Sequence, residues 1–366
     1  DEVDSMDISI TIPKGLMNVS NGRLKNIEEH YNTITTHWTV KNPINNYGVN
    51  VNIGDYVNFS EVYKGENGDL DLDYWVLSYN IEKAKKQFKE APRMIEAFEY
   101  WFGAYPFYED SFKLVEVPYL GMEHQSSVTY GNGYQNGYLG RDLSGTGIGL
   151  KFDFIIVHEG GHEWFANSIT NKDVADMWIH EGFTAYAENL FVNYFISTTA
   201  SADYVIGTRR LIQNDRPLIS TYNVNSEGSS DMYYKGANML HTLRQLIEND
   251  IKWRQILRGI NKDFYHQTVT SQQIEDYLSK KTGIDLTEFF NQYLRTTMIP
   301  TLEYKFEDGN LKYRWINIVE KFDMPIQVLV DGKYEWLFPN AEWKSKPVKS
   351  NSIEIDRNFY VESKQL

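Results

Sequence analysis

The sequence predicts an α+β fold in which a mainly helical middle part lies between two β-rich parts. Short alternating apolar runs fill the first 75 residues, apolar residues recur at helical spacing from about residue 80, and alternation returns after Pro300. At roughly 150 residues per domain, a chain of 366 residues suggests two or three domains. We therefore expect three parts, covering residues 1–75, 76–300 and 301–366.

The N-terminal part contains strand-like runs, such as residues 8–12 and 47–53, separated by Pro, Asn and Gly. Asp69, Asp71 and Asp73 alternate with apolar residues, which predicts a strand with one acidic, solvated face. A calcium loop of the EF-hand type would need a glutamate at its twelfth position, and none is present. Because the first strand begins so close to residue 1, we expect an upstream part of the protein to be missing.

The middle part begins with a predicted helix over residues 81–102, followed by strands over 112–117 and 122–130. Residues 131–149 are rich in Gly but lack the sequence context of phosphate and dinucleotide loops, so a long loop is predicted. Seven helices then follow, over residues 151–169, 180–197, 201–214, 233–249, 252–262, 271–281 and 285–296.

The C-terminal part returns to strand signals and is expected to form a small β-sandwich. An Asp308-Gly309 turn separates runs over 302–306 and 311–316, and Asp331-Gly332 follows another apolar run. Asp-Gly between alternating runs is a strong hairpin signal.

Composition excludes several classes of function. The chain has no cysteine, which excludes disulfides, thiolate metal sites and a cysteine nucleophile. The net charge of −14 disfavours nucleic acid as a partner, and no apolar stretch is long enough for a transmembrane helix. The compartment stays open, with a periplasmic or secreted location slightly favoured over the cytoplasm, and no oligomeric state is predicted.

The strongest motif is His158-Glu159-Gly160-Gly161-His162. Residues four apart lie on one face of a helix, so two imidazoles can bind one metal from the same side, while the glutamate can polarise a bound water. Glu181, eighteen residues after His162, offers a third ligand from a second helix. Two histidines and one glutamate leave a fourth position open, which is typical of a catalytic zinc site. The alternative is that both histidines are core or capping residues and Glu181 is a surface acid.

Four segments together resemble the aminopeptidase N family of zinc metallopeptidases, the M-one family, which includes leukotriene hydrolase. The segments are His158 to Asn167, Trp178 to Phe183, Leu120 to His124, and Met232 to Gly236. The resemblance implies a thermolysin-like (gluzincin) catalytic domain over 76–300, the end of an N-terminal β-domain before it, and a β-sandwich after it. Family members are longer, so the resemblance also implies that this chain is a piece of a larger protein. It further implies that this protein is a bacterial member of the family.

The resemblance assigns roles to residues of the motif and of the downstream segment. His158, His162 and Glu181 would hold one zinc ion per chain. Glu159 would be the general base that takes a proton from the attacking water, and Tyr233 would donate a hydrogen bond to the developing oxyanion. Tyr233 could instead be a packing residue, and Tyr234 would take its place if the register is shifted by one.

The upstream segment is implied to bind the substrate. Glu123 would pair with the free α-amine of a peptide, which fixes cleavage after the first residue. Met122 would lie near the pocket for the first side chain, and Gly121 would let the substrate backbone approach the strand. The alternative for Glu123 is a surface acid on an edge strand.

The sequence departs from the family pattern near the site. His124 and His180 stand where the family has Asn, Leu120 stands for a Gly, and Tyr234 stands for a Glu. His180 is adjacent to Glu181 on a predicted helix and so points about 100° away, which argues against a role as a fourth ligand. His124 could contact substrate or simply pack.

The sequence thus predicts a zinc aminopeptidase that acts on peptides with a free N-terminus. Two alternatives remain: another enzyme of related fold, either a zinc endopeptidase or an epoxide hydrolase, and a catalytically silent scaffold. An endopeptidase has no use for an amine-binding Glu123, and a silent relative usually lacks a ligand or the base.

Overall fold

The computed structural model describes residues 2–366, which divide into two compact units. Unit 1 comprises the residues up to Thr170 together with Ala187–Tyr204 and Arg258–Thr268, and unit 2 comprises Asn171–Tyr186, Val205–Leu257 and Val269–Leu366. Helix α4 (Trp178–Phe195) contributes residues to both units. The predicted α+β class is confirmed, while the predicted three-part division stays a prediction.

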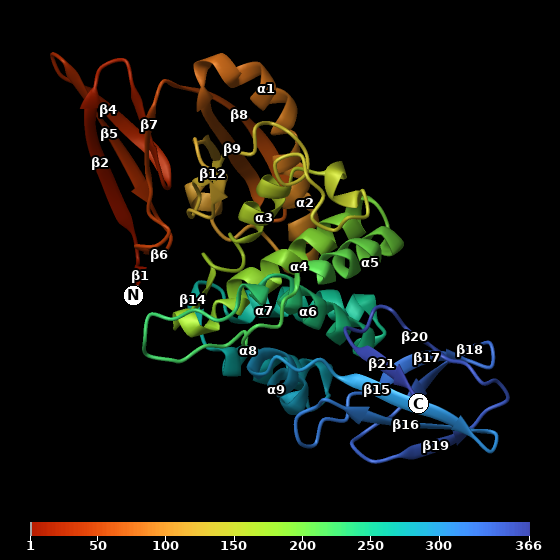
Figure 1. Cartoon of the computed structure of the whole chain (residues 1–366). Helices are drawn as coiled ribbons and strands as arrows, with labels where there is room; N and C mark the ends of the chain where they lie inside the picture. Colours follow the sequence, from red (N-terminus) through yellow and green to blue (C-terminus); the bar gives the residue numbers. More distant parts are fainter. Residues whose placement is uncertain (1) are drawn as a thin grey trace. The chain divides into compact units, whose positions relative to one another are not determined.

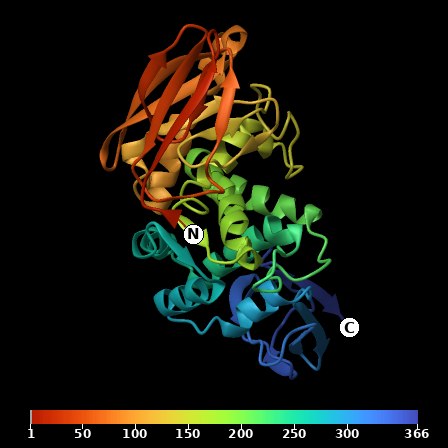
Figure 2. The same cartoon turned by 90° about the vertical axis from the view of Figure 1, so that its left-hand side faces the viewer.

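Unit 1 begins with small antiparallel sheets that share one apolar core. Strands β2, β5 and β4 form one sheet, seen as the long red strands of Figure 2, while β3 pairs with β7 and β1 with β6. The bounds are β1 (Glu2–Val3), β2 (Met6–Pro13), β3 (Met17–Ser20), β4 (Arg23–Glu29), β5 (Thr33–Val40), β6 (Ile44–Asn45) and β7 (Val51–Gly54). Trp38, Val40 and Val19 lie in this core, and Val115 joins it from the next sheet.

A five-stranded sheet in the order β11-β12-β10-β9-β8 follows in unit 1. Its strands are β8 (Tyr56–Gly65), β9 (Gly68–Leu77), β10 (Phe112–Glu116), β11 (Gly121–Met122) and β12 (Val128–Tyr130). Strand β10 is parallel to both of its neighbours. The prediction for 69–73 is confirmed, because β9 buries Leu70 and Leu72 and turns its aspartates away from the core. The single strand predicted over 122–130 is wrong: β11 and β12 are antiparallel and are joined by residues 123–127.

The helix predicted over 81–102 is in fact two helices, α1 (Ile81–Gln87) and α2 (Glu90–Phe102). Pro92 lacks an N–H group and cannot bond to the carbonyl of Phe88, so the hydrogen-bond ladder is interrupted between the two helices. The loop predicted over 131–149 is confirmed, since isolated bridges at Gly137 and between Tyr138 and Arg141, and the start of a short 3₁₀ turn, Ile148–Lys151, are its regular structure.

Helix α3 (Phe154–Gly161) carries the first histidine of the motif and is buried along its whole length. Asp153 caps it by accepting hydrogen bonds from the N–H groups of Ile155 and Ile156. The same buried carboxylate accepts bonds from Tyr130 and Asn132 at 2.8 and 2.9 Å. In Figure 1, α3 lies beside α2 and β12. The predicted helix over 151–169 is too long, because turns and strand β13 (Ile169–Asn171) follow His162.

The remaining helices confirm the predicted helical region, although the helix predicted over 201–214 begins earlier and ends at Gly207, where a 3₁₀ turn follows. They are α5 (Thr198–Gly207), α6 (Tyr234–Ile247), α7 (Asp250–Asp263), α8 (Ser271–Thr282) and α9 (Thr287–Arg295), with strand β14 (Gln267–Val269) between α7 and α8. Further 3₁₀ turns span Ser78–Asn80, Tyr108–Asp110, Val174–Asp176, Thr208–Leu211 and Ser230–Met232. No helix of residues 2–366 is long and apolar enough to cross a membrane.

The end of unit 2 consists of two sheets, in the orders β19-β16-β15-β21 and β18-β17-β20 (Figure 1). Their strands are β15 (Thr301–Glu307), β16 (Asn310–Ile316), β17 (Ile326–Val330), β18 (Lys333–Leu337), β19 (Lys344–Pro347), β20 (Glu354–Ile355) and β21 (Glu362–Gln365). Both Asp-Gly hairpins are confirmed, between β15 and β16 and between β17 and β18.

Replacement of Asp153 by Ala should lower the free energy of unfolding of unit 1 by about 3 kcal/mol, since it removes a helix cap and leaves the buried Tyr130 hydroxyl without its acceptor. Urea unfolding followed by tryptophan fluorescence measures the change. Asp285→Ala is the control, because the exposed Asp285 accepts two local hydrogen bonds from Thr287, at 3.0 and 2.7 Å, and its loss should cost about 1 kcal/mol. Equal losses in the two variants would contradict the importance of the buried cap.

Candidate functional site

Helix α3 and the turn that follows it bring the two histidines of the motif together. His158 and His162 are 5% and 1% exposed, and their ring centroids lie 4.9 Å apart. His162 keeps helical backbone angles at the C-terminal cap of α3, so the two side chains remain one turn apart on the same face.

Each histidine is oriented through Nδ1. His158 Nδ1 lies 2.7 Å from Glu188 Oε1, and His162 Nδ1 lies 2.9 Å from the carbonyl oxygen of Phe165. An ionised carboxylate and a carbonyl can only accept, so both Nδ1 atoms carry the proton and Nε2 becomes the atom that can bind a metal. Tyr204 donates to the other oxygen of Glu188 at 2.6 Å, which fixes that carboxylate in turn.

Helix α4 carries both Glu181 and Glu188, seven residues apart and therefore on the same face. His158, His162 and Glu181 each offer one ligand atom, and these atoms lie within 4.8 Å of one another. Two neutral imidazoles and one buried carboxylate are the donor set that zinc takes in catalytic sites, so these residues fit the ion that the sequence predicts. His180 Nε2 instead accepts the Asn171 N–H at 2.8 Å, which argues against metal binding by that nitrogen.

A second group joins the predicted base to the predicted amine-binding residue. Ligand atoms of Glu123, Glu159 and His162 also lie within 4.8 Å of one another, and all three side chains are buried. The group thus places two carboxyl groups beside one of the candidate metal ligands. Such a site suits a cationic group such as an ammonium.

The segment that carries Glu123 is bonded to the end of the HExxH motif. Asn167 Nδ2 donates to the Glu123 carbonyl at 2.9 Å, and the Ser126 N–H donates to Glu163 Oε1 at 2.7 Å. Burial raises the pKa of Glu163 to about 8, although the Ser126 N–H and the Lys113 ammonium oppose the shift. Burial likewise lowers the pKa of Lys113 to about 8. The two hydrogen bonds from Asn167 and to Glu163 fix the Glu123 segment relative to the residues that follow α3.

Gly121 and Met122 form strand β11, immediately before Glu123. A side chain at Gly121 would come within 2.7 Å of Ile155 and 3.2 Å of Glu159, so only glycine allows this close approach to α3. Met122 is half-buried. The substrate contacts predicted for both residues stay predictions.

Tyr233 lies at the N-terminal cap of α6, after the 3₁₀ turn Ser230–Met232. A side chain at Gly236 would approach Gly182 to 2.9 Å, and one at Gly182 would approach the Met232 carbonyl to 3.1 Å. The Gly182 backbone leaves no room for a Cβ at Gly236, and a Cβ at Gly182 would make a tight contact, so α6 and the Tyr233 turn pack closely against the first turn of α4, which carries Glu181.

Three residues of the site were missed by the sequence analysis: Glu188, Asn167 and Tyr47. Glu188 could have been found, because it follows Glu181 by two helical turns. Asn167 ends the segment His158 to Asn167 that carries the family resemblance, but it had no assigned role. Tyr47, whose hydroxyl donates to Glu123 Oε1 at 2.6 Å, lies 76 residues upstream of Glu123, and no sequence pattern connects the two.

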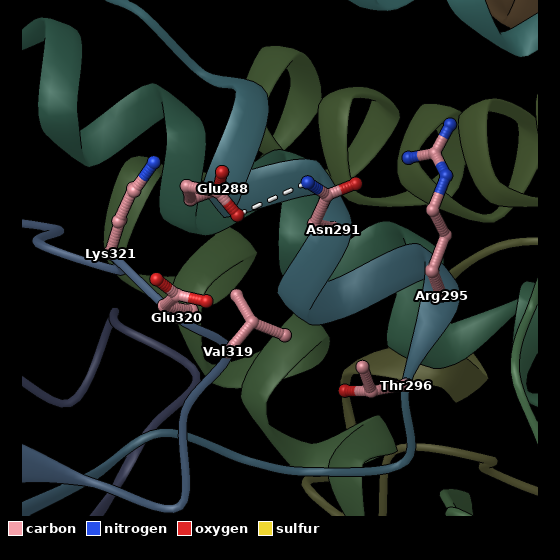
Figure 3. A pocket seen from close by; sticks show the side chains of 7 residues that line it. All are labelled: Glu288, Asn291, Arg295, Thr296, Val319, Glu320 and Lys321. Carbon is pink, nitrogen blue, oxygen red and sulfur yellow. Dashed lines mark hydrogen bonds between the residues drawn. The ribbon is translucent and has the colours of Figure 1, made fainter.

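A separate polar hollow in unit 2 is lined by residues of α9, by Thr296 after it and by the segment 319–321. Figure 3 shows charges of both signs around it, from Glu288, Arg295, Glu320 and Lys321, and a hydrogen bond between Glu288 and Asn291. It contains none of the residues of the HExxH site.

A helix-borne HExxH pair with a carboxylate from the next helix is the arrangement of metal-dependent hydrolases. Residues 86–293, more than half of the chain, match the model of the peptidase family M1 domain. The chain therefore belongs to peptidase family M1, which confirms the resemblance seen in the sequence.

Individual relatives agree with this result. The chain is 26% identical to aminopeptidase N of Lactobacillus helveticus, over 74% of this chain and 33% of that protein. It resembles the structure of Legionella pneumophila aminopeptidase A in complex with aspartic acid, with a TM-score of 0.77, 16% identity, and coverage of 98% of this chain and 44% of that one. It also resembles the structure of the M1 zinc metallopeptidase of Deinococcus radiodurans, with a TM-score of 0.68, 20% identity, and coverage of 81% of this chain and 65% of that one. The chain spans between 33% and 48% of the first curated relatives it matches.

Replacement of Glu188 by Gln should weaken zinc binding by about 10- to 100-fold, since the amide no longer fixes the tautomer and orientation of His158. Competition against a chelator measures the dissociation constant. The control is Glu96→Gln, because Glu96 is exposed and also accepts a tyrosine hydroxyl, that of Tyr194 at 2.9 Å. Equal zinc affinity in the two variants would remove Glu188 from the metal site.

Proposed function

We propose that the chain is a zinc-dependent aminopeptidase, which hydrolyses the first peptide bond of peptides with a free N-terminus. The observation that supports this most directly is the position of Glu123, a buried carboxylate whose ligand atom lies within 4.8 Å of those of Glu159 and His162. An endopeptidase needs no anion at this point, whereas an aminopeptidase must bind an ammonium group there.

His158, His162 and Glu181 would hold the ion through two Nε2 atoms and one carboxylate oxygen. When bound, zinc would polarise the attacking water and the scissile carbonyl. The Nδ1 partners of both histidines fix the tautomer and the orientation of each ring for this role.

Three side chains would act on the substrate. Glu159 takes a proton from the attacking water and passes it to the leaving amine. Glu123 pairs with the α-ammonium group and so fixes the scissile bond one residue from the N-terminus. Tyr233 donates a hydrogen bond to the oxygen on which negative charge develops.

Replacement of Glu159 by Gln should lower kcat by roughly 10²- to 10⁴-fold, because the amide cannot accept the proton. Zinc content, measured by elemental analysis, should remain that of the unmodified chain, since Glu159 is not among the three proposed ligands. Retained turnover would remove Glu159 from the role of general base, and loss of zinc would instead place it among the ligands.

The specificity can be tested with a matched pair of substrates, a free-amine tripeptide and its N-acetylated twin, on the zinc-loaded chain. Only the free-amine peptide should be cleaved, with release of its first residue. Glu123→Ala should lower kcat/KM for this peptide by roughly 10- to 100-fold, because a charge-assisted hydrogen bond is lost. Equal cleavage of both peptides would identify an endopeptidase, and an unaffected Glu123→Ala variant would refute the amine-binding role.

A further inference from the structure

We propose that Tyr47, from the N-terminal β-rich segment, is a positioning residue for the amine-binding carboxylate of Glu123. This inference rests on the proposed aminopeptidase function and adds a residue to that site. Tyr47 would set the direction of the carboxylate, and so the position of the substrate's α-ammonium group.

The contact joins a buried acid to a half-exposed phenol. Tyr47 lies in the loop between β6 and β7, and its hydroxyl donates to Glu123 Oε1 at 2.6 Å. Glu123 is 5% exposed, whereas Tyr47 is 45% exposed. The phenol therefore reaches from the surface to a carboxylate that is otherwise enclosed, and it engages one of its two oxygens.

The two segments are held together independently of this contact. Gln125 Nε2 donates to the Pro43 carbonyl at 2.9 Å. Asn21 Nδ2 donates to the Gln125 and Gly48 carbonyls, at 2.6 and 2.7 Å. Hydrogen bonds thus hold the backbone near Tyr47, at Pro43 and Gly48, and the backbone near Glu123, at Gln125. The position of the hydroxyl is consequently fixed before any substrate binds.

A fixed donor on one carboxylate oxygen limits rotation of the Glu123 side chain. One carboxylate oxygen of Glu123 also belongs to the group that it shares with Glu159 and His162, so the donor holds the carboxylate in place within that group. The ammonium group of a substrate is charged both before and during the reaction. Its contact with Glu123 therefore stabilises the bound substrate and the transition state equally. Loss of the donor should therefore raise KM and leave kcat nearly unchanged.

The test is Tyr47→Phe, which removes one hydroxyl and keeps the ring. We expect KM for the free-amine tripeptide to rise about tenfold, with kcat within about twofold of the unmodified chain. Tyr31→Phe is the control, because Tyr31 belongs to the same β-rich segment and is 92% exposed. The thermal unfolding midpoint of each variant is measured alongside, to check that the fold is intact.

The Glu123→Ala background separates this proposal from the proposed function. There, Tyr47→Phe should have no further effect on KM, because the hydroxyl acts only through the carboxylate. An unchanged KM in the single variant, a fall in kcat alone, or an equal rise in KM in both backgrounds would overturn the role of Tyr47. If Glu123→Ala itself still prefers the free-amine peptide as strongly as the unmodified chain, the proposed function fails, and the role of Tyr47 fails with it.

Discussion

The site depends on one constraint: helix α3 is buried on every side, so each polar group that it carries must find a partner inside the protein. Asp153 accepts hydrogen bonds from N–H groups in the first turn of the helix. Glu188 accepts from Nδ1 of His158, and the Phe165 carbonyl accepts from Nδ1 of His162. Because an unpaired polar group at such depth costs free energy, the pairing selects one orientation for each imidazole. Both histidines then present the same kind of nitrogen to a metal.

The second organising feature is the segment 123–127, which is bonded from two directions. Asn167 and Glu163 hold it from the end of the HExxH motif, while Asn21 holds it from the β-rich segment. Since its backbone groups are satisfied by fixed partners, the segment can keep an irregular conformation, with a positive φ of 53° at Ser126. These bonds hold the Glu123 carboxylate in one position although it lies outside a regular strand.

The sequence predicted the parts of this site that depend on local spacing. An i, i+4 pair on an apolar helix, followed by a glutamate on the next helix, was enough to place His158, His162 and Glu181 in one candidate centre. Tyr47 and Asn21 were not predictable, because contacts across 76 or 104 residues leave no periodic signal. The predicted helix over 151–169 extends too far because apolar residues continue past His162, whereas turns begin there.

The division of the chain into units bears on how it is synthesised. Unit 1 draws on three separate stretches, the last of which ends at Thr268, so nearly a hundred residues beyond Thr170 must leave the ribosome before it is complete. Domains generally fold as units during translation, and contacts of long sequence separation form slowly. The nascent chain therefore exposes an unfinished apolar interior around α3 for several seconds, at a translation rate of about 5–20 residues per second. In the cell, this is the interval in which chaperones would be most useful to the protein.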